Sequence, residues 1–225
     1  MSDPAIEAVL FDIDGTLITT GGAGATAWRR AFEELHGVGV DIREVTESGQ
    51  VDTEVGAAGL RRVLGREPDP HELAAAMGCY LKHLPEAVAE SDGYRVMPGI
   101  EPLLDRLVDS GHLLGLTTGN VEAAAHIKLS RGRLNRFFAF GGYGSDATDR
   151  VSLTRQALER AAVVSGGAVR PEECIAVGDT PRDVEAAHGA GIRVAAVATG
   201  NFPAEKLRAS GADWVLETVE EGFPV

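Results

Sequence analysis

The stretch that decides the fold is Ala8-Val-Leu-Phe-Asp-Ile-Asp-Gly-Thr-Leu17. Its first four residues are apolar without alternation, which is typical of a β-strand covered on both faces in a parallel sheet. Two carboxylates, Asp12 and Asp14, follow the strand directly, and Gly15 suits a loop with unusual backbone dihedral angles. Because open α/β sheets bind ligands at the carboxyl ends of their strands, we expect chemistry at this point.

Further apolar runs predict four more strands, at residues 112–117, 174–178, 193–197 and 214–216. Helical patterns alternate with them, at residues 100–110, 121–129, 153–164 and 182–190. This alternation predicts an α/β fold with a Rossmann-like parallel sheet flanked by helices.

One long interval breaks the alternation. Between Asp12 and His112 the sequence shows no convincing strand but three helical patterns, at residues 25–35, 53–64 and 70–84. A block of this length is too long for one crossover, and its ends at residues 21–22 and 91–99 have the composition of flexible connections. We therefore expect a core domain of residues 1–17 and 95–225 and a helical cap of residues 18–94 that acts as a lid.

Composition excludes several classes of protein. The chain has 225 residues, 44% of them hydrophobic and 24% charged, as in an ordinary globular protein. Its net charge of −13 repels phosphate backbones and argues against a nucleic-acid partner. No stretch approaches the roughly 18 apolar residues of a membrane span, and the short apolar run near the N-terminus does not form a signal peptide.

The cysteines point to a reducing compartment. Cys79 and Cys174 are far apart and belong to no CxxC pair or zinc-binding spacing. We expect two buried, reduced thiols in a cytoplasmic protein. The sequence gives no indication of the oligomeric state.

Polar residues follow two more of the predicted strands, in Thr117-Thr-Gly-Asn120 and in Gly178-Asp-Thr-Pro-Arg-Asp183. Clustered carboxylates raise one another's pKa unless a cation lies among them, and oxygen ligands of this kind suit Mg²⁺. Three strand ends would form one rim that carries Asp12, Asp14, Thr118, Asp179 and Asp183.

Together these motifs resemble the haloacid dehalogenase superfamily, specifically its phosphatases with a helical cap after the first strand. Residues 11–17 match the family's first motif and residues 178–184 its last, and the resemblance covers nearly the whole chain. In general pattern it is similar to phosphoglycolate phosphatases. The resemblance implies Mg²⁺-dependent hydrolysis of a small phosphorylated metabolite, with Asp12 as the nucleophile that becomes an aspartyl phosphate and Asp14 as the acid and base.

The resemblance also implies ligands for the metal and the phosphate. Asp12, the backbone carbonyl of Asp14 and Asp179 would hold Mg²⁺. Thr118 and the neighbouring amides, with Gly119 allowing close approach, would bind phosphate oxygens, and Asp183 would support the site from behind. Two alternatives stay open: Thr118 would instead cap the helix predicted at residues 121–129, and Asp183 would stabilise its own helix through the dipole.

The family's third motif is where the sequence departs from the pattern. That motif is a lysine, usually followed by proline, and no Lys-Pro pair lies in this chain. Lys128 is in the right interval, but we expect it to come too early, on the helix directly after the second motif. Arg150 occupies about the expected place and would pair with phosphate and carboxylate. The alternative is a solvated loop in which Asp149 or Ser152 caps the next helix.

Other functions remain open at this point. A phosphosugar mutase of the same superfamily shares both aspartates and would form a phosphorylated isomer instead of free phosphate. A non-catalytic phosphate-binding protein is compatible with the missing lysine. A phospho-acceptor domain is disfavoured, because it is much shorter and carries its acceptor on a middle strand. A halide-releasing enzyme is disfavoured because it needs no acid at Asp14.

Overall fold

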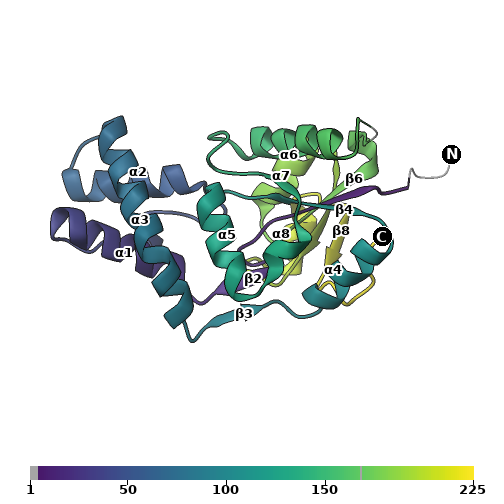
Figure 1. Ribbon diagram of the computed structural model, residues 1–225, viewed down its shortest axis with the longest axis horizontal. Coiled ribbons are helices and arrows are strands. Elements are labelled where there is room, and N and C mark those ends of the chain that lie inside the picture. The colour runs from purple at the N-terminus through teal and green to yellow at the C-terminus, as the bar shows by residue number, and fades with distance from the viewer. Residues whose placement is uncertain (1–4, 168) are drawn as a thin grey trace.

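A computed structural model describes residues 5–167 and 169–225. Its central layer is a six-stranded parallel sheet in the order β5-β4-β1-β6-β7-β8 (Figure 1). The strands are β1 (Ala8–Phe11), β4 (Leu113–Thr117), β5 (Phe140–Gly142), β6 (Cys174–Gly178), β7 (Arg193–Val197) and β8 (Trp214–Leu216). Because β1 pairs with both β4 and β6, the carboxyl ends of these three strands lie side by side.

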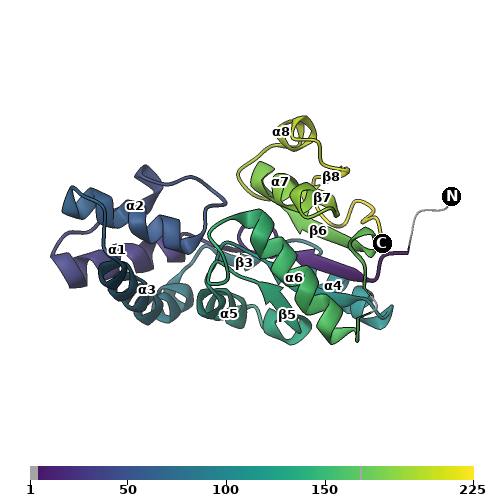
Figure 2. The same ribbon diagram turned by 90° about the horizontal axis from the view of Figure 1, so that it is seen from above.

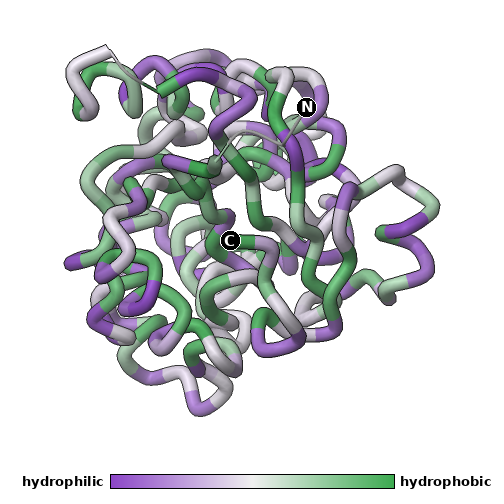
Figure 3. The backbone as a smooth tube through the Cα atoms, turned by 90° about the vertical axis from the view of Figure 1, so that its right-hand side faces the viewer, coloured by the Kyte–Doolittle hydropathy of each residue, from purple (hydrophilic) through white to green (hydrophobic). Residues whose placement is uncertain are grey.

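Helices cover both faces of this sheet (Figure 2). Along β1, Val9 and Phe11 pack with residues of α4 (Ile100–Asp109) and α5 (Glu122–Arg131). The alternate residues of the same strand pack with α6 (Arg150–Val164), α7 (Pro181–Gly189) and α8 (Ala204–Ala209). Every residue of β1 is therefore buried, which explains its continuous apolar sequence. Figure 3 shows hydrophobic residues along the central strands.

Three helices form a separate group beside the sheet, on the left of Figure 1: α1 (Ala23–His36), α2 (Asp52–Leu64) and α3 (Pro70–Glu90). We call them the helical cluster. They share an apolar core in which Trp28 stacks on Tyr80 with 4.3 Å between ring centroids. A 3-10 helix, Ile42–Glu44, lies between α1 and α2. The division of the chain into domains at residues 18 and 95 stays a prediction.

Two short strands connect the helical cluster to the sheet. β2 (Ile18–Thr20) and β3 (Tyr94–Val96) pair antiparallel. The expectation that no strand lies between Asp12 and His112 is therefore wrong. Strands of three residues are too short to show a periodicity, and their pairing joins segments more than seventy residues apart.

β5 is the other strand outside the five predicted ones, although the run at residues 137–140 is strand-like in sequence and overlaps it at Phe140. Its sequence is Phe-Gly-Gly, which reads as a turn and not as a strand. Glycine is required there because a Cβ on Gly142 would lie 1.9 Å from the carbonyl oxygen of Leu153 on α6. Because α6 packs so closely on this strand, the strand needs glycine and lacks the side chains that identify a strand in a sequence.

The other predicted strands and crossover helices agree with the structure. The five predicted strands and the four crossover helices are present within a few residues of their expected bounds. Cys79 and Cys174 are both buried and free, as expected. Among the helices of the described residues, none combines the length and apolar character that crossing a membrane requires.

Candidate active site

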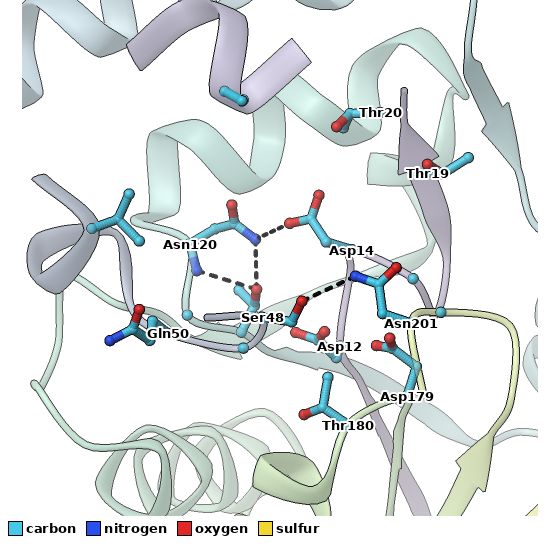
Figure 4. Close-up of a pocket in the computed structure, with 18 of the residues that line it drawn as sticks. Asp12, Asp14, Thr19, Thr20, Ser48, Gln50, Asn120, Asp179, Thr180 and Asn201 are labelled. Carbon is cyan, nitrogen blue, oxygen red and sulfur yellow. Dashed lines mark hydrogen bonds between the residues drawn. The ribbon is translucent and has the colours of Figure 1, made fainter. Parts of the chain in front are cut away.

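A cavity of about 470 Å³ lies at the carboxyl ends of β1, β4 and β6. Asp12, Thr118 and Asp179 line it from these three strand ends. The helical cluster closes the opposite side with residues of α1 and α3 and with the loop at residues 46–50. Figure 4 shows Asp12, Asp14 and Asp179 together in this cavity. The rim expected from the sequence is therefore assembled as the strand order requires.

Three carboxylates meet at the base of the site. Asp12, Asp179 and Asp183 are buried, and each offers an oxygen within 4.8 Å of the others. Burial raises the pKa of Asp12 to about 7, although Arg150 acts in the opposite direction. Burial, together with Asp183 and Asp12, raises the pKa of Asp179 to about 9. A group of this kind is stable as carboxylates at neutral pH only when a cation lies among them.

Asp183 lies behind the cavity wall and makes two kinds of contact. Its Oδ2 accepts hydrogen bonds from the amide of Thr180 at 2.9 Å and from the hydroxyl of Thr180 at 2.7 Å. The first of these bonds, with the bond that the Asp183 amide donates to the Thr180 hydroxyl at 3.3 Å, forms the capping box of α7. Its Oδ1 accepts a hydrogen bond from Arg150. The two roles considered for Asp183 are therefore compatible, because one oxygen serves its own helix and the other orients a neighbouring cation.

Gly15 allows the first motif to approach Asp179. It has a φ of 91°, and a Cβ at this position would lie 2.3 Å from Oδ2 of Asp179. The hydroxyl of Thr16 donates a hydrogen bond to Asp179 at 3.2 Å, while the hydroxyl of Thr199 donates one to the Gly15 carbonyl at 2.6 Å. A side chain at Gly15 would push this turn away from the carboxylates.

Asp14 differs from the buried carboxylates, because its side chain is 40% exposed. Its Oδ2 accepts hydrogen bonds from Nζ of Lys128 at 2.7 Å and from Nδ2 of Asn120 at 2.8 Å. Figure 4 shows the contact between Asn120 and Asp14. Lys128 also donates to Oδ1 of Asn120 at 2.6 Å. The three side chains therefore hold one another at the edge of the cavity.

Lys128 reaches the site and contacts Asp14, whereas the expectation that it comes too early to be the family's third-motif lysine stays a prediction. Lys128 lies about two turns after the start of α5, which begins next to the cavity. Helical side chains point towards the N-terminus, and the long lysine stem carries the ammonium back to the cavity. Although burial acts against it, the carboxylates of Asp14 and Asp52 raise the pKa of Lys128, so the ammonium stays charged.

Arg150, the first residue of α6, also points into the site. Its side chain is 11% exposed, and Nη2 lies 3.5 Å from Oδ1 of Asp12. Asp149 caps the same helix by accepting a hydrogen bond from the amide of Ser152 at 2.9 Å. Arg150 therefore pairs with carboxylates as expected, and Asp149 caps the helix, but the Arg150 side chain is not solvated; its contact with phosphate stays a prediction. Nε of Arg150 is buried and has no hydrogen-bond partner among the residues described, so it can donate to an incoming oxygen.

Thr118 and Gly119 lie where the second motif meets the cavity. The Thr118 hydroxyl accepts hydrogen bonds from the amide and the side chain of Asn120 and keeps its own proton for another acceptor. Its amide is already bonded to the carbonyl of Gly142 at 3.0 Å. Thr118 does not cap α5, whose N-cap residue is Val121. A Cβ on Gly119 would lie 2.7 Å from the carbonyl oxygen of Gln50, so glycine is needed for the helical cluster to approach.

Asp52 is a buried residue that the sequence did not single out. It is the first residue of α2, and its amide donates a hydrogen bond to the Gly119 carbonyl at 2.8 Å. Its Oδ2 accepts one from the amide of Val121 at 2.9 Å and so caps α5 from the helical cluster. Burial raises the pKa of Asp52 to about 6, although Lys128 lowers it. In the sequence Asp52 looks like an ordinary acidic residue at the start of its own helix.

Comparison with known proteins gives consistent results. A family model described as haloacid dehalogenase-like hydrolase matches residues 6–191. The chain is 26% identical to a phosphoglycolate phosphatase of Synechococcus elongatus over 215 residues, covering 95% of this chain and 93% of that protein. It is 30% identical to a phosphoglycolate phosphatase of Cereibacter sphaeroides over 197 residues, covering 85% of each. The crystal structure of CbbY from Rhodobacter sphaeroides in complex with phosphate is 25% identical, with a TM-score of 0.77 and 96% of each chain covered.

Proposed function

Because the chain belongs to the haloacid dehalogenase-like hydrolase family and is a phosphatase, we propose that it hydrolyses a small organic phosphomonoester with Mg²⁺ through an aspartyl phosphate on Asp12. The observation that carries this proposal is the position of Asp12, whose buried carboxylate faces a cavity between Arg150 and two further carboxylates. The substrates of the named relatives support a small phosphorylated metabolite. A cytoplasmic location stays a prediction.

Catalysis would proceed in two displacements. The carboxylate of Asp12 attacks phosphorus, a new O–P bond forms, and the bond from phosphorus to the ester oxygen breaks. Asp14 gives its proton to the leaving alcohol. Asp14 then takes a proton from a water molecule that attacks the phosphorus, so that inorganic phosphate leaves and Asp12 is restored. The partial exposure of Asp14 suits this exchange with water.

Arg150 and Thr118 would hold the phosphoryl group. Arg150 approaches from α6 beside Asp12, and the hydroxyl of Thr118 has a proton to donate. A phosphoryl group in transfer spreads negative charge over its outer oxygens, and donors fixed in a dry site stabilise that charge. Arg150 would take the place of the family's lysine, since it is the cation beside Asp12.

The acidic cluster fits a divalent cation. Asp12, the backbone carbonyl of Asp14 and Asp179 would hold Mg²⁺, which prefers oxygen ligands. When bound, Mg²⁺ supplies positive charge that offsets the repulsion between the Asp12 carboxylate and a dianionic phosphate. The raised pKa values of Asp12 and Asp179 support this proposal, because Arg150 does not offset the effects of burial and of the neighbouring carboxylates.

The helical cluster would act as a lid, and the structure would then represent its closed position. Besides Asp52, two contacts join the loop at residues 46–50 to the core. Nδ2 of Asn201 donates to Ser48 at 3.0 Å (Figure 4), and Arg182 pairs with Glu47 at 2.9 Å. Closure excludes water from the reacting phosphate. The connections through β2 and β3 would be the hinges.

The test of this function is phosphate release from a panel of small phosphoesters, with Mg²⁺ and with a chelator. We expect release with Mg²⁺ and none in chelator. Formation of a phosphorylated isomer in place of free phosphate would support the mutase instead, and activity retained in chelator would contradict the metal.

Asp14→Asn should slow hydrolysis more for a substrate with a poor leaving group than for one with a good leaving group. An amide cannot protonate the departing alcohol, so the rate on an alkyl phosphate should fall by about 10² to 10⁴. An activated aryl phosphate needs less help from an acid, and its first step should be affected much less, as measured by the burst of aryl alcohol. Equal losses in that burst and in alkyl phosphate cleavage would contradict the acid role.

Asp179→Asn should stabilise the metal-free protein and weaken its response to Mg²⁺. The raised pKa of Asp179 means that the stability contributed by its protonated form is present near pH 4 and is lost as pH rises towards about 9. Asparagine avoids this loss, so in chelator at pH 8 the variant should have a melting temperature several degrees above that of wild type. For a chain of this size, 1 kcal/mol of stability corresponds to about 2–4 °C.

Differential scanning calorimetry with and without Mg²⁺ provides the measurement, and the exposed Asp105→Asn is the control. Wild type should gain stability on adding Mg²⁺, and Asp179→Asn should gain less. An identical Mg²⁺ response in the two proteins would place the metal elsewhere.

A further inference from the structure

The hydroxyl of Tyr80 faces the cavity without a partner. Tyr80 lies on α3, is 1% exposed, and its ring stacks on Trp28 with an interplanar angle of 6°. Among the described residues its hydroxyl makes no hydrogen bond, although the residue lines the cavity. The hydroxyl lies at the cavity and keeps its proton for a hydrogen bond to a ligand.

A second donor converges on the same place. The Tyr80 hydroxyl and Nζ of Lys128 lie 4.0 Å and 3.9 Å from the position that a Cβ on Gly24 would occupy. Lys128 donates two of its three N–H groups to Asp14 and Asn120. One N–H of Lys128 and the O–H of Tyr80 therefore remain for a ligand beside the bare backbone of α1.

Asp52 adds an acceptor to this wall of the cavity. Its Oδ2 is bonded to the amide of Val121, and its other oxygen has no hydrogen-bond partner in the part of the chain that the structure describes. Asp52 lines the cavity together with Gly24, Tyr80 and Lys128, and we call these four residues the Tyr80 subsite. The subsite offers two donors and one acceptor.

Local charge decides which group fits the subsite. The single ammonium of Lys128 lies between the carboxylates of Asp14 and Asp52, whose fields both act on it. A carboxylate on the substrate would meet a wall that is already negative, whereas a hydroxyl accepts from Tyr80 or Lys128 and donates to Asp52. Burial, together with Asp52 and Asp14, raises the pKa of Tyr80, so it remains a neutral donor.

We propose that the Tyr80 subsite binds a hydroxyl group on the alcohol portion of the substrate, so that the enzyme selects polyol or sugar phosphates over carboxylated or unsubstituted phosphoesters. This inference rests on the proposed phosphatase function. The cavity of about 470 Å³ is within the range of small-ligand sites and has room for a carbon chain beyond the phosphate. Tyr80 and Asp52 are thereby specificity residues on the helical cluster.

The test compares kcat/KM on three phosphoesters: glycerol 1-phosphate carries hydroxyls, phosphoglycolate carries a carboxylate, and ethyl phosphate carries neither. Wild type should prefer glycerol 1-phosphate over the other two by about tenfold or more, the effect of one or two buried hydrogen bonds. Tyr80→Phe removes one oxygen and keeps the stacked ring. This variant should lower kcat/KM on glycerol 1-phosphate about tenfold, whereas its kcat/KM on ethyl phosphate should stay within threefold of the wild-type value.

Two further variants separate a local role from a structural one. Gly24→Ala places a methyl group between the two donors at ordinary contact distance, so it should lower kcat/KM on glycerol 1-phosphate without lowering the melting temperature. Tyr143 is a buried tyrosine away from the cavity, and Tyr143→Phe should leave kcat/KM unchanged on both glycerol 1-phosphate and ethyl phosphate.

Four outcomes contradict the proposal. Equal losses on glycerol 1-phosphate and ethyl phosphate in Tyr80→Phe would show a structural role. Preference of wild type for phosphoglycolate would show that the subsite takes a carboxylate. Phosphate release from none of the esters would overturn the phosphatase function and this inference together, whereas hydrolysis of all three with Tyr80→Phe indistinguishable from wild type would overturn the subsite alone.

Discussion

Asp12→Asn should abolish phosphate release, with a loss in kcat on the order of 10⁴-fold or more. The amide nitrogen and oxygen of asparagine cannot attack phosphorus as a carboxylate does, so no aspartyl phosphate forms. The fold should survive, because Asp12 is buried with its charge incompletely compensated and an amide of the same shape removes that charge. We expect the melting temperature in chelator to equal or exceed that of wild type.

The measurement combines steady-state phosphate release with trapping of the phosphorylated enzyme. Wild type quenched in acid during turnover should carry phosphate on Asp12, detectable by intact mass, and Asp12→Asn should carry none. Asp105→Asn, an exposed change of the same chemistry on α4, should keep wild-type activity. Near wild-type turnover in Asp12→Asn would exclude Asp12 as the nucleophile.

Arg150→Ala should lower kcat by about 10²- to 10³-fold, the loss seen when a donor to developing negative charge is removed. Arg150 is the cation beside Asp12, and its unpartnered Nε has donor capacity left for a phosphoryl oxygen. Asp12, Asp179 and a dianionic phosphate together exceed the charge of one Mg²⁺, so a second cation is expected on electrostatic grounds. Arg150→Lys should recover part of the rate, because it restores the charge without the planar geometry.

Stability has to be followed in the same variants, since Arg150→Ala also leaves Asp183 without its ionic partner. Rates are therefore compared at a temperature where each variant is folded by circular dichroism. Arg155→Ala, on the same helix but outside the cavity, is the matched control and should keep full activity. Lys128→Met provides the contrast: if it abolished turnover while Arg150→Ala did not, the role of the family's lysine would belong to Lys128.

The sequence determined the fold class and the acidic part of the site. Continuous apolar runs of four or five residues identify strands buried on both faces, and this property depends only on neighbouring residues. Asp12, Asp14 and Asp179 come at the ends of such strands, so the strand order brings them to one edge of the sheet. The strands that escaped prediction, β2, β3 and β5, are three residues long and lack this pattern.

Tertiary structure decided which side chains complete the cavity. Lys128 reaches Asp14 because of the direction in which α5 leaves the sheet, and the linear distance between sequence motifs carries no information about that direction. Asp52 caps α5, and the Tyr80 hydroxyl opens beside Lys128, only because the helical cluster lies against the core. Local patterns determine strands and the residues attached to their ends, whereas contacts between distant elements depend on how whole helices pack, which no short stretch of sequence encodes.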